Sequence, residues 1–573
     1  MAVSFAVSEI TLIDDTVLTP PANGMTLFIG PNNSGKSAML RELSPRITEP
    51  NTTGNAYWVR QVLPTHEGSE QEFLEWLTSR GHRSWSVNGQ AHLRGGQSPL
   101  SSVSRAGAGQ WWTLGMYAEL RSMLVMDQWT EARLQVRAQA ERWDHAEPAG
   151  DPVQFLYEDP DLLVALSGYT VEAFGQEIAL DWTAPRFALR VGATGMVDQT
   201  PPPAELVAAY RRLPEVSVQG DGFKAFVQIL LHTVLRPTPV IVIDEPEAFL
   251  HPPQARLLGR ILAQLPGQTQ VFVATHSADF LAGVMDAQDA RPLSIVRLDR
   301  SSGVSRAMQL NPDEVAELLR TPLLRYSNIS SGLFYDRVVL CESEGDCQFY
   351  AATFDVTRET SAPHENTIFL HTSGKARLAD TARRLRAFGI PTAVIADFDL
   401  LNNHGTVRNA MTALGGTVLD MTADIKTLND HANSERSVPT VNGFRNAMAA
   451  VLTGPGSSPL TEAMITAMNN VIKGSSGWGA LKKSGLAALN GTEYAAAERL
   501  LKNTAAHGLF LVPCGELEQW VRSIPQGNKA AWLAEVFNGQ DRWYQKPTDQ
   551  LRDFCQQIRS YFDTPTPHAR AAS

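Results

Sequence analysis

The octapeptide GPNNSGKS at residues 30–37 constrains the fold of this chain more than any other stretch. It fits the pattern G-x-x-x-x-G-K-[ST], follows the apolar run MTLFI and precedes a helical pattern. Its glycines let the backbone wrap closely, and the N–H groups of the loop and of the next helix can bind phosphate oxygens. Strand, loop and helix in this order predict a phosphate-binding loop within an α/β fold.

The loop residues have distinct expected roles in binding ATP and Mg²⁺. Lys36 is expected to reach the β- and γ-phosphates, and Ser37 is expected to ligate Mg²⁺. The rest of the loop is expected to cradle the phosphates, and its residues are Gly30, Asn32, Asn33, Ser34 and Gly35.

Two later runs predict the other half of this nucleotide site. In VIVIDEP at 240–246, four apolar residues predict a buried strand, with Asp244 at its end to support Mg²⁺ and Glu245 next to it to polarise the attacking water. VFVATHS at 271–277 predicts another buried strand, followed by His276. Because this histidine would lie at the same sheet edge, it is expected to contact the γ-phosphate.

The composition fits a globular chain of several domains. At 573 residues and 43% hydrophobic content, about two to four domains are expected. The net charge of −11 means that any nucleic-acid binding relies on local basic patches or metal ions. The N-terminus lacks a basic leader, and no run approaches the roughly 18 apolar residues of a membrane span, so we expect a cytoplasmic protein without a membrane partner.

In the second half of the chain, three apolar runs end in acids. VVLCE ends at Glu342, TAVIADFD carries Asp397 and Asp399, and LFLVPCGELE carries Glu516 and Glu518. The carboxyl ends of parallel strands meet at one sheet edge, and crowded carboxylates repel unless a cation neutralises them. Oxygen donors suit Mg²⁺ or Mn²⁺, and two such ions about 4 Å apart would stabilise both oxygens of a phosphodiester displacement.

The first half resembles a known group of ATPases. DEPEAFLHPPQ at 244–254, followed by ATHSADFL, is similar to the ABC-type ATPases of the SMC-like and OLD (overcoming lysogenisation defect) group. The resemblance implies that Asp244 and Glu245 are the Walker B pair and His276 the switch histidine. It also implies hydrolysis between two heads, with VQGDGFKAF at 218–226 as the signature loop and Gly222 at the nucleotide. Gly220 stands where most members have serine. Gln61 is a candidate Q-loop residue.

The second half resembles the TOPRIM domain of OLD nucleases. The resemblance rests on VVLCESEGDC, VIADFD and GELEQW, with Ser343 in place of the usual glycine. It implies that Glu342 is catalytic and that Lys529 in NKAAW contacts the scissile phosphate. The implied metal ligands are Glu342, Asp346, Asp397, Asp399 and Glu518, with Glu516 as second choice to Glu518. SGKARLADTARRL is expected to form a basic patch for the nucleic-acid backbone.

These patterns predict an α/β chain of two main domains. Residues 1–325 are expected to form an ABC/SMC-like P-loop ATPase domain with a helical insertion at about 110–210, a possible dimerisation or partner-binding region. Within it, 111–142 is expected to be helical, with a face that is either solvated or a nucleic-acid or partner surface. A linker at 326–335 leads to a TOPRIM domain at 336–550, a Rossmann-like parallel sheet with a helical insertion at about 410–505. A helix and a disordered tail are expected at 551–573.

The resemblance as a whole implies an OLD-family ATP-dependent endonuclease, similar to the Gabija nuclease and to retron-associated OLD effectors in anti-phage defence. It implies DNA cleavage with Mg²⁺ or Mn²⁺, ATP as cofactor, a homodimer or higher oligomer, and a partner protein or RNA from the defence system. Two alternatives stay open. The same architecture could cut RNA such as tRNA, or the chain could be an ATP-switched nucleic-acid sensor with an inactive TOPRIM domain.

Overall fold

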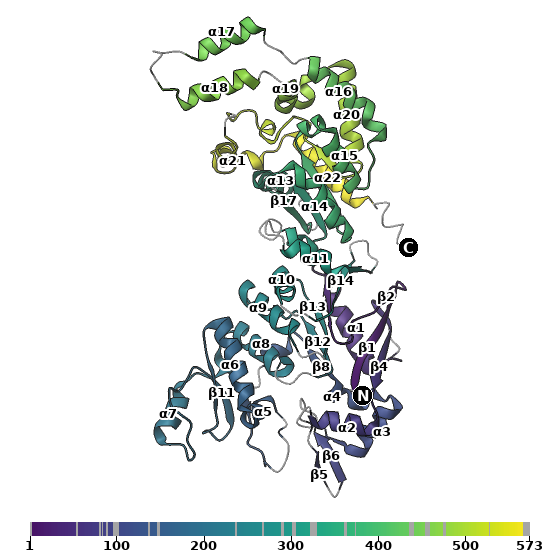
Figure 1. The fold of residues 1–573 in the computed structure, drawn as a ribbon, viewed down its shortest axis with the longest axis vertical. Coiled ribbons are helices and arrows are strands. Elements are labelled where there is room, and N and C mark those ends of the chain that lie inside the picture. Colours follow the sequence, from purple (N-terminus) through teal and green to yellow (C-terminus); the bar gives the residue numbers. More distant parts are fainter. Residues whose placement is uncertain are drawn as a thin grey trace. The chain divides into compact units, whose positions relative to one another are not determined.

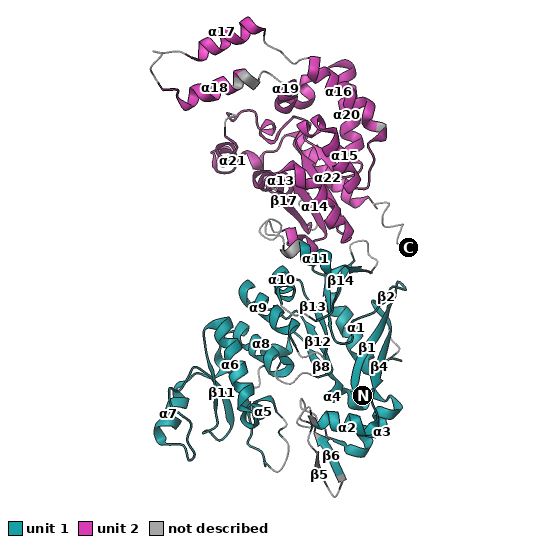
Figure 2. Cartoon of the chain, in the orientation of Figure 1, with its two compact units in different colours: residues 1–322 teal, residues 323–573 magenta. Residues whose placement is uncertain are grey.

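The computed structural model describes most of the chain. The described residues are 3–52, 56–79, 82, 84–87, 90–94, 102–135, 138–145, 149, 151–234, 238–265, 269–287, 291–300, 305–320, 329–359, 364–372, 374–434, 440–452, 459–473, 477–525 and 528–564. The chain divides into two compact units, Met1–Pro322 and Leu323–Ser573 (Figure 2).

A six-stranded sheet in the order β15-β14-β3-β13-β12-β8 forms the centre of the first unit (Figure 1). Its strands are β3 (Met25–Ile29), β8 (Val125–Gln128), β12 (Val240–Asp244), β13 (Gln270–Ala274), β14 (Leu293–Asp299) and β15 (Arg306–Leu310). All neighbours pair in parallel except β14 and β15. Every residue of β3, β12 and β13 is buried, which is typical of parallel strands covered on both faces.

Helices and small antiparallel sheets surround this centre. The sheets are β2-β1-β4 (Val17–Leu18, Ser4–Leu12, Val59–Glu67), β5-β6-β7 (Ser84–Val87, Gln90–Arg94, Ser102–Ser104) and β10-β11-β9 (Ile178–Asp181, Phe187–Val191, Gln139–Ala140). The helices are α1 (Lys36–Thr48), α2 (Glu70–Ser79), α3 (Arg105–Leu114), α4 (Arg121–Leu124), α5 (Pro152–Glu158), α6 (Pro160–Phe174), α7 (Ala204–Arg212), α8 (Asp221–Ile229), α9 (Pro252–Ala263), α10 (Ala278–Asp286) and α11 (Pro312–Arg320).

The described residues between 111 and 142 do not form the long helix that the sequence predicted. Helix α3 ends at Leu114, and after α4 the chain enters β8, which pairs with β12 of the central sheet. The short apolar run LVM fits a helix or a strand equally well, because periodicity cannot separate the two over so few residues. Pairing with a strand more than one hundred residues away decides the outcome, and no local pattern reveals that partner.

The second unit is built on a four-stranded parallel sheet in the order β17-β16-β18-β19. Its strands are β16 (Arg337–Cys341), β17 (Thr367–His371), β18 (Thr392–Ala396) and β19 (Leu509–Leu511). Helices α13 (Glu344–Thr357) and α14 (Lys375–Ala387) connect the first three strands. Together with the first unit, this parallel sheet with connecting helices confirms the predicted α/β class.

The long connection from β18 to β19 is helical, as the sequence indicated. It contains α15 (His404–Ala413), α16 (Thr422–Ser434), α17 (Val441–Val451), α18 (Glu462–Lys473), α19 (Gly477–Ser484) and α20 (Gly491–Ala505). After β19 follow α21 (Lys529–Asn538) and α22 (Asp549–Asp563), and α22 buries Leu551, Phe554 and Ile558 in the core of this unit.

The segment predicted as a linker is partly built into the second unit. Residues 326–328 lie outside the described residues, but Ile329–Phe334 forms a 3-10 turn whose Ile329 and Leu333 are fully buried. Residues 565–573 of the expected tail also lie outside the described part. Among the described helices, none is both long and apolar enough to cross a membrane.

Candidate functional site

The phosphate-binding loop connects β3 to α1 in the first unit. Gly35 caps α1 in the left-handed region at φ 90°, which a residue with a Cβ rarely adopts. A Cβ there would also come within 2.4 Å of Trp58 Nε1, so both backbone and packing require glycine. Lys36 is buried, and its Nζ donates to the carbonyls of Gly30 at 3.0 Å and Pro31 at 2.7 Å. The lysine therefore lies inside the curve of the loop.

Ser37 and Asp244 meet although 207 positions separate them. The Ser37 hydroxyl donates to Asp244 Oδ1 at 2.8 Å, because β3 and β12 both flank β13 and end at the same edge of the sheet. Burial raises the pKa of Asp244, and the bond from Ser37 opposes that rise. The two side chains expected to hold Mg²⁺ are thus adjacent oxygen donors, which is the chemistry that Mg²⁺ prefers.

Glu245 and His276 form a polar pair at this edge. His276 Nδ1 lies 3.3 Å from Glu245 Oε1 and 3.3 Å from Glu247 Oε1. The hydrogen bond between His276 and Glu245 lowers the pKa of Glu245 and raises the pKa of His276. Glu247, which the sequence analysis did not single out, is buried and accepts from Thr275 Oγ1 at 2.7 Å and from the His276 N–H at 2.9 Å. It therefore positions the histidine.

Arg133 is a second residue that sequence reasoning missed, because its segment was taken for a solvated helix. Its guanidinium is fully buried and donates to the carbonyls of Asp244 and Glu245, both at 2.6 Å, and of Gln128 at 3.1 Å. Burial lowers the pKa of Arg133 to about 10. Glu245 has φ 48°, a conformation that non-glycine residues seldom adopt. Arg133 thus braces the strained backbone that carries Glu245.

Gln128 ends β8 beside the Asp244 strand, whereas Gln61 does not lie at this edge. Gln61 is an exposed residue of β4, paired with Thr11 in the antiparallel β2-β1-β4 sheet, and its candidacy as the Q-loop residue stays a prediction. The predicted signature residue Gly222 is the second residue of α8, and a Cβ there would approach the Phe249 carbonyl to 2.5 Å.

Replacing Arg133 by methionine is expected to lower both the stability of the first unit and its ATP turnover. Each buried carbonyl left without a donor costs about 1–3 kcal/mol. A displaced Glu245 is expected to slow hydrolysis by roughly a hundredfold. The thermal unfolding midpoint and the ATPase rate check this. The control is Arg211→Met, since Arg211 is exposed. If the two variants have the same unfolding midpoint and ATPase rate, Arg133 does not brace the backbone of Glu245.

In the second unit, Glu342 follows β16 and Asp397 follows the adjacent strand β18. Glu342 Oε1 accepts the backbone N–H of Asp397 at 3.1 Å, so the Glu342 carboxylate lies at the strand end that carries Asp397. Burial raises the pKa of Glu342. Burial, together with the charges of Glu342 and Asp346, raises the pKa of Asp397 to about 8.

Two further groups of charges flank this pair. Asp346 completes a capping box with Ser343 at the start of α13, and Lys529 Nζ donates to its Oδ1 at 2.6 Å. Burial lowers the pKa of Lys529, whereas the charges of Asp346 and Glu518 raise it. The second effect is larger, so the pKa of Lys529 lies above its usual value. Glu518, which the sequence placed first among the late acids, therefore lies within electrostatic range of the Asp346 side of the site.

Asp399 lies on the other side, between two lysines. Lys375 at the start of α14 forms an ion pair with Asp399 Oδ1 and lies 3.8 Å from Glu342 Oε1. Lys482 Nζ, from α19, lies 3.9 Å from Asp399 Oδ2 and 3.7 Å from Glu516 Oε2. Burial raises the pKa of Glu516, and Glu518 raises it further. Lys482 is a third residue that sequence reasoning missed, because it belongs to a helical insertion without a recognised motif.

Three lysines thus form ion pairs with four of the acids, namely Glu342, Asp346, Asp399 and Glu516. Within the described ranges, no three His, Cys, Asp or Glu side chains are gathered closely enough to hold one metal ion. The predicted ligands nevertheless fit a divalent cation, because they are carboxylate oxygens and the half-buried Glu342 carboxylate reaches the backbone of Asp397 at the adjacent strand end.

Metal affinity is expected to rise with pH until about pH 8. Below that value Asp397 carries a proton that a metal ion must displace, so the apparent affinity should increase by about tenfold per pH unit. The groups that set this pKa are Glu342, Asp346, Asp399 and Lys375. Calorimetric titration with Mn²⁺ between pH 6 and pH 9 checks the slope. An unchanged slope in Asp397→Asn would contradict the assignment.

Several cations of the basic patch predicted on α14 have partners within this unit. Arg383 and Arg384 pair with Asp380 on the same helix, and Arg386 donates to Tyr561 Oη at 3.1 Å. Lys375 turns toward the acids. The exposed Arg377 lies seven positions before Arg384 and so on the same face of the helix, and the patch stays a prediction.

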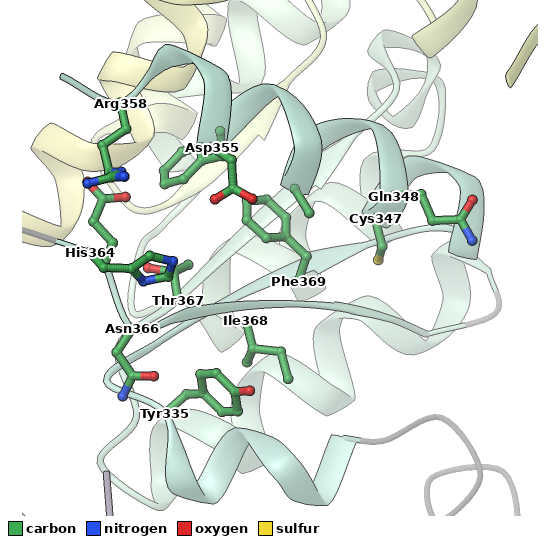
Figure 3. A pocket seen from close by; sticks show the side chains of 13 residues that line it. Tyr335, Cys347, Gln348, Asp355, Arg358, His364, Asn366, Thr367, Ile368 and Phe369 are labelled. Atoms are coloured by element: carbon green, nitrogen blue, oxygen red, sulfur yellow. The ribbon is translucent and has the colours of Figure 1, made fainter. Parts of the chain in front are cut away.

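A cavity of about 470 Å³ opens between α13 and β17 (Figure 3). Its lining includes Tyr335, Asp355, Arg358 and Phe369, and none of the predicted metal ligands. The nuclease chemistry considered above does not involve it.

Two family models match segments of the chain. Residues 208–282 match AAA_21, whose description reads "AAA domain" and names the AbiEii toxin and a Type IV TA system. Residues 333–399 match the TOPRIM domain described as "Overcoming lysogenization defect protein-like". No curated protein matches the chain.

Solved structures that resemble the chain include SMC head domains. One is the SmcHead bound to the C-winged helix domain of ScpA, at 12% identity and TM-score 0.32, covering 54% of this chain and 99% of its own. Another is the Smc head domain derived from Pyrococcus furiosus, at 10% identity and TM-score 0.30, covering 55% and 98%. A third is the SMC head domain from Thermotoga maritima, at 14% identity and TM-score 0.27, covering 54% and 100%.

The ATPase match includes Asp244, Glu245 and His276, and the TOPRIM match includes Glu342, Asp346, Asp397 and Asp399. ATPase and TOPRIM domains use ATP and divalent metal ions. The chain thus carries, in this order, a segment similar to an AAA-type ATPase domain and a segment similar to an OLD-like TOPRIM domain, which supports ATPase and metal-dependent nuclease activity.

Proposed function

We propose that this chain is an ATP-regulated endonuclease that cleaves DNA phosphodiester bonds with Mg²⁺ or Mn²⁺. The observation that supports it most is that Glu342 and Asp397 follow adjacent parallel strands and meet there, where the Glu342 carboxylate accepts the backbone N–H of Asp397, with Asp346 and Asp399 near enough to act on Asp397. Glu342, Asp346, Asp397, Asp399 and Glu518 would hold the ions. When bound, the ions would stabilise the attacking and leaving oxygens of the phosphodiester.

Lys529 would contact the scissile phosphate. Its ammonium is half-exposed and lies on Asp346, so it can donate to a phosphate oxygen near the acids. In the first unit, the loop from Gly30 to Ser37 would hold ATP, Ser37 and Asp244 would hold Mg²⁺, Glu245 would orient water and His276 would contact the γ-phosphate. Gly222 would reach the nucleotide of a second head, which makes a homodimer or higher oligomer part of the proposal.

A cleavage assay tests this function. Purified protein is incubated with plasmid DNA and, separately, with total tRNA, in Mg²⁺, Mn²⁺ or EDTA, with and without ATP. We expect plasmid to be nicked or cut only with the divalent ion, and ATP to change the rate. Cleavage of tRNA alone would replace DNA by RNA as the substrate, and cleavage of neither would leave an ATP-switched sensor.

The cellular role is proposed as cytoplasmic defence of bacteria against phage, on the similarity to OLD-type defence nucleases. Plaque counts on bacteria that express the chain, compared with bacteria that express Asp397→Ala, measure it. Protection that does not depend on Asp397 would contradict a nuclease effector.

A further inference from the structure

The helical insertion between β18 and β19 brings one lysine to the acids. Lys482 lies in α19, and its Nζ is within 4 Å of both Asp399 and Glu516. Its side chain is 41% exposed, so a ligand from solvent can reach the ammonium. Its neighbour Lys483 is also exposed. One of two adjacent lysines therefore points to the site.

The backbone around Lys482 is fixed against the site. Gly515 has φ 112°, and a Cβ there would lie 2.2 Å from the Lys482 carbonyl oxygen, so the two segments pack closely only because residue 515 is glycine. Leu486 N donates to the Pro513 carbonyl at 2.9 Å, and Phe398 N donates to the Gly515 carbonyl at 2.8 Å. Lys482 is thus connected through Gly515 to the turn that carries Asp397 and Asp399.

Asp399 has more cationic partners than one carboxylate needs. Lys375 pairs with Oδ1, and Lys482 lies near Oδ2. If Lys482 moves away, Asp399 still has Lys375 as its partner. The ion pairs of Lys482 with Asp399 and Glu516, at 3.7–3.9 Å, are partly exposed to solvent and therefore weak. An ammonium on a flexible stem can exchange one anionic oxygen for another. The Lys482 ammonium could therefore bind either the carboxylates of the site or a phosphate oxygen of the nucleic acid.

We propose that Lys482 is a phosphate-binding residue of the nuclease site and that it competes with the divalent cation for Asp399 and Glu516; this rests on the proposed function. A divalent cation bound to these carboxylates would displace the Lys482 ammonium. The displaced ammonium would then bind a phosphate of the nucleic acid. Metal ion and nucleic acid therefore strengthen each other's binding, and the coupling is reciprocal.

Two measurements on the full chain test this role. Mn²⁺ affinity is measured without nucleic acid, and binding of a short DNA duplex is measured in Ca²⁺ over a range of salt concentrations. In Lys482→Met, Mn²⁺ is expected to bind about twofold to fivefold more tightly, since the competing ion pairs are gone. The slope of log affinity against log salt concentration is expected to become shallower by about 0.9, the contribution of one phosphate contact.

The matched control is Lys483→Met, which is expected to behave as the unmodified protein in both measurements. Lys482→Arg should keep the salt slope of the unmodified protein. If Lys482→Met disturbs folding, Lys482→Gln takes its place and should show the same two changes. If Lys482→Met matches Lys483→Met, or binds Mn²⁺ less tightly, the role of Lys482 is refuted. If Asp397→Asn binds Mn²⁺ as well as the unmodified protein does, the proposed nuclease site itself fails.

Discussion

Replacing Asp397 by alanine is expected to abolish nucleic-acid cleavage while ATP hydrolysis continues. Asp397 follows the strand next to the one that ends before Glu342, and alanine keeps its backbone hydrogen bond to Glu342 but removes the carboxylate oxygens that are proposed to hold the metal ion. Metal ions supply several kcal/mol of transition-state stabilisation, and each 1.36 kcal/mol is a factor of ten, so cleavage should fall on the order of a thousandfold. The cleavage rate and the ATPase rate of the same preparation are compared.

A second pair of aspartates provides the control for this variant. Asp159 and Asp161 have the same D-x-D spacing, but they lie at the start of α6, where Asp159 caps the helix. Asp161 is exposed, and Asp161→Ala is expected to leave both activities unchanged. Cleavage that survives in Asp397→Ala would show that the acids at the β16 and β18 ends are not the nuclease site.

Replacing Lys36 by alanine is expected to remove nucleotide binding and, with it, every effect of ATP on cleavage. A hydrogen bond to a charged group contributes about 1.5–3 kcal/mol, so ATP affinity should fall about 10- to 150-fold. Lys36 lies buried within the loop, and alanine leaves the loop carbonyls of Gly30 and Pro31 without this donor. Binding of a fluorescent ATP analogue and ATP turnover measure the loss.

Arg60→Ala is a suitable control for Lys36→Ala, since Arg60 is an exposed cation of β4 in the same unit. Undiminished ATP turnover in Lys36→Ala, alongside an unaffected Arg60→Ala, would mean that nucleotide binds elsewhere on the chain.

Local motifs predicted those parts of the fold whose backbone conformation follows from a short stretch of sequence. The loop at 30–37, the strand that ends at Asp244 and the strand that ends at Asp397 each contain their own strand and turn signals, and the parallel order of the sheets brings their ends together. The acids Glu342 and Asp397 come from adjacent strands for the same reason.

What the sequence could not predict depends on pairing over long distances. Strand β8 and the buried Arg133 rely on β12, more than one hundred positions away. Lys482 reaches Asp399 across 83 positions, and only the packing of α19 against Gly515 determines that contact. The lysines on Asp346 and Asp399 were likewise not foreseen, because motif spacing contains no information about which cation neutralises which acid.

Divalent-cation binding by the second unit tests the central claim most directly. Mn²⁺ is titrated into the full chain at pH 8 without nucleotide, alongside a Glu342→Gln/Asp397→Asn double variant. We predict that Mn²⁺ binds to the unmodified chain and that this binding is lost in the double variant, whose thermal unfolding should otherwise resemble that of the unmodified chain. Equal Mn²⁺ binding by both proteins would contradict the account.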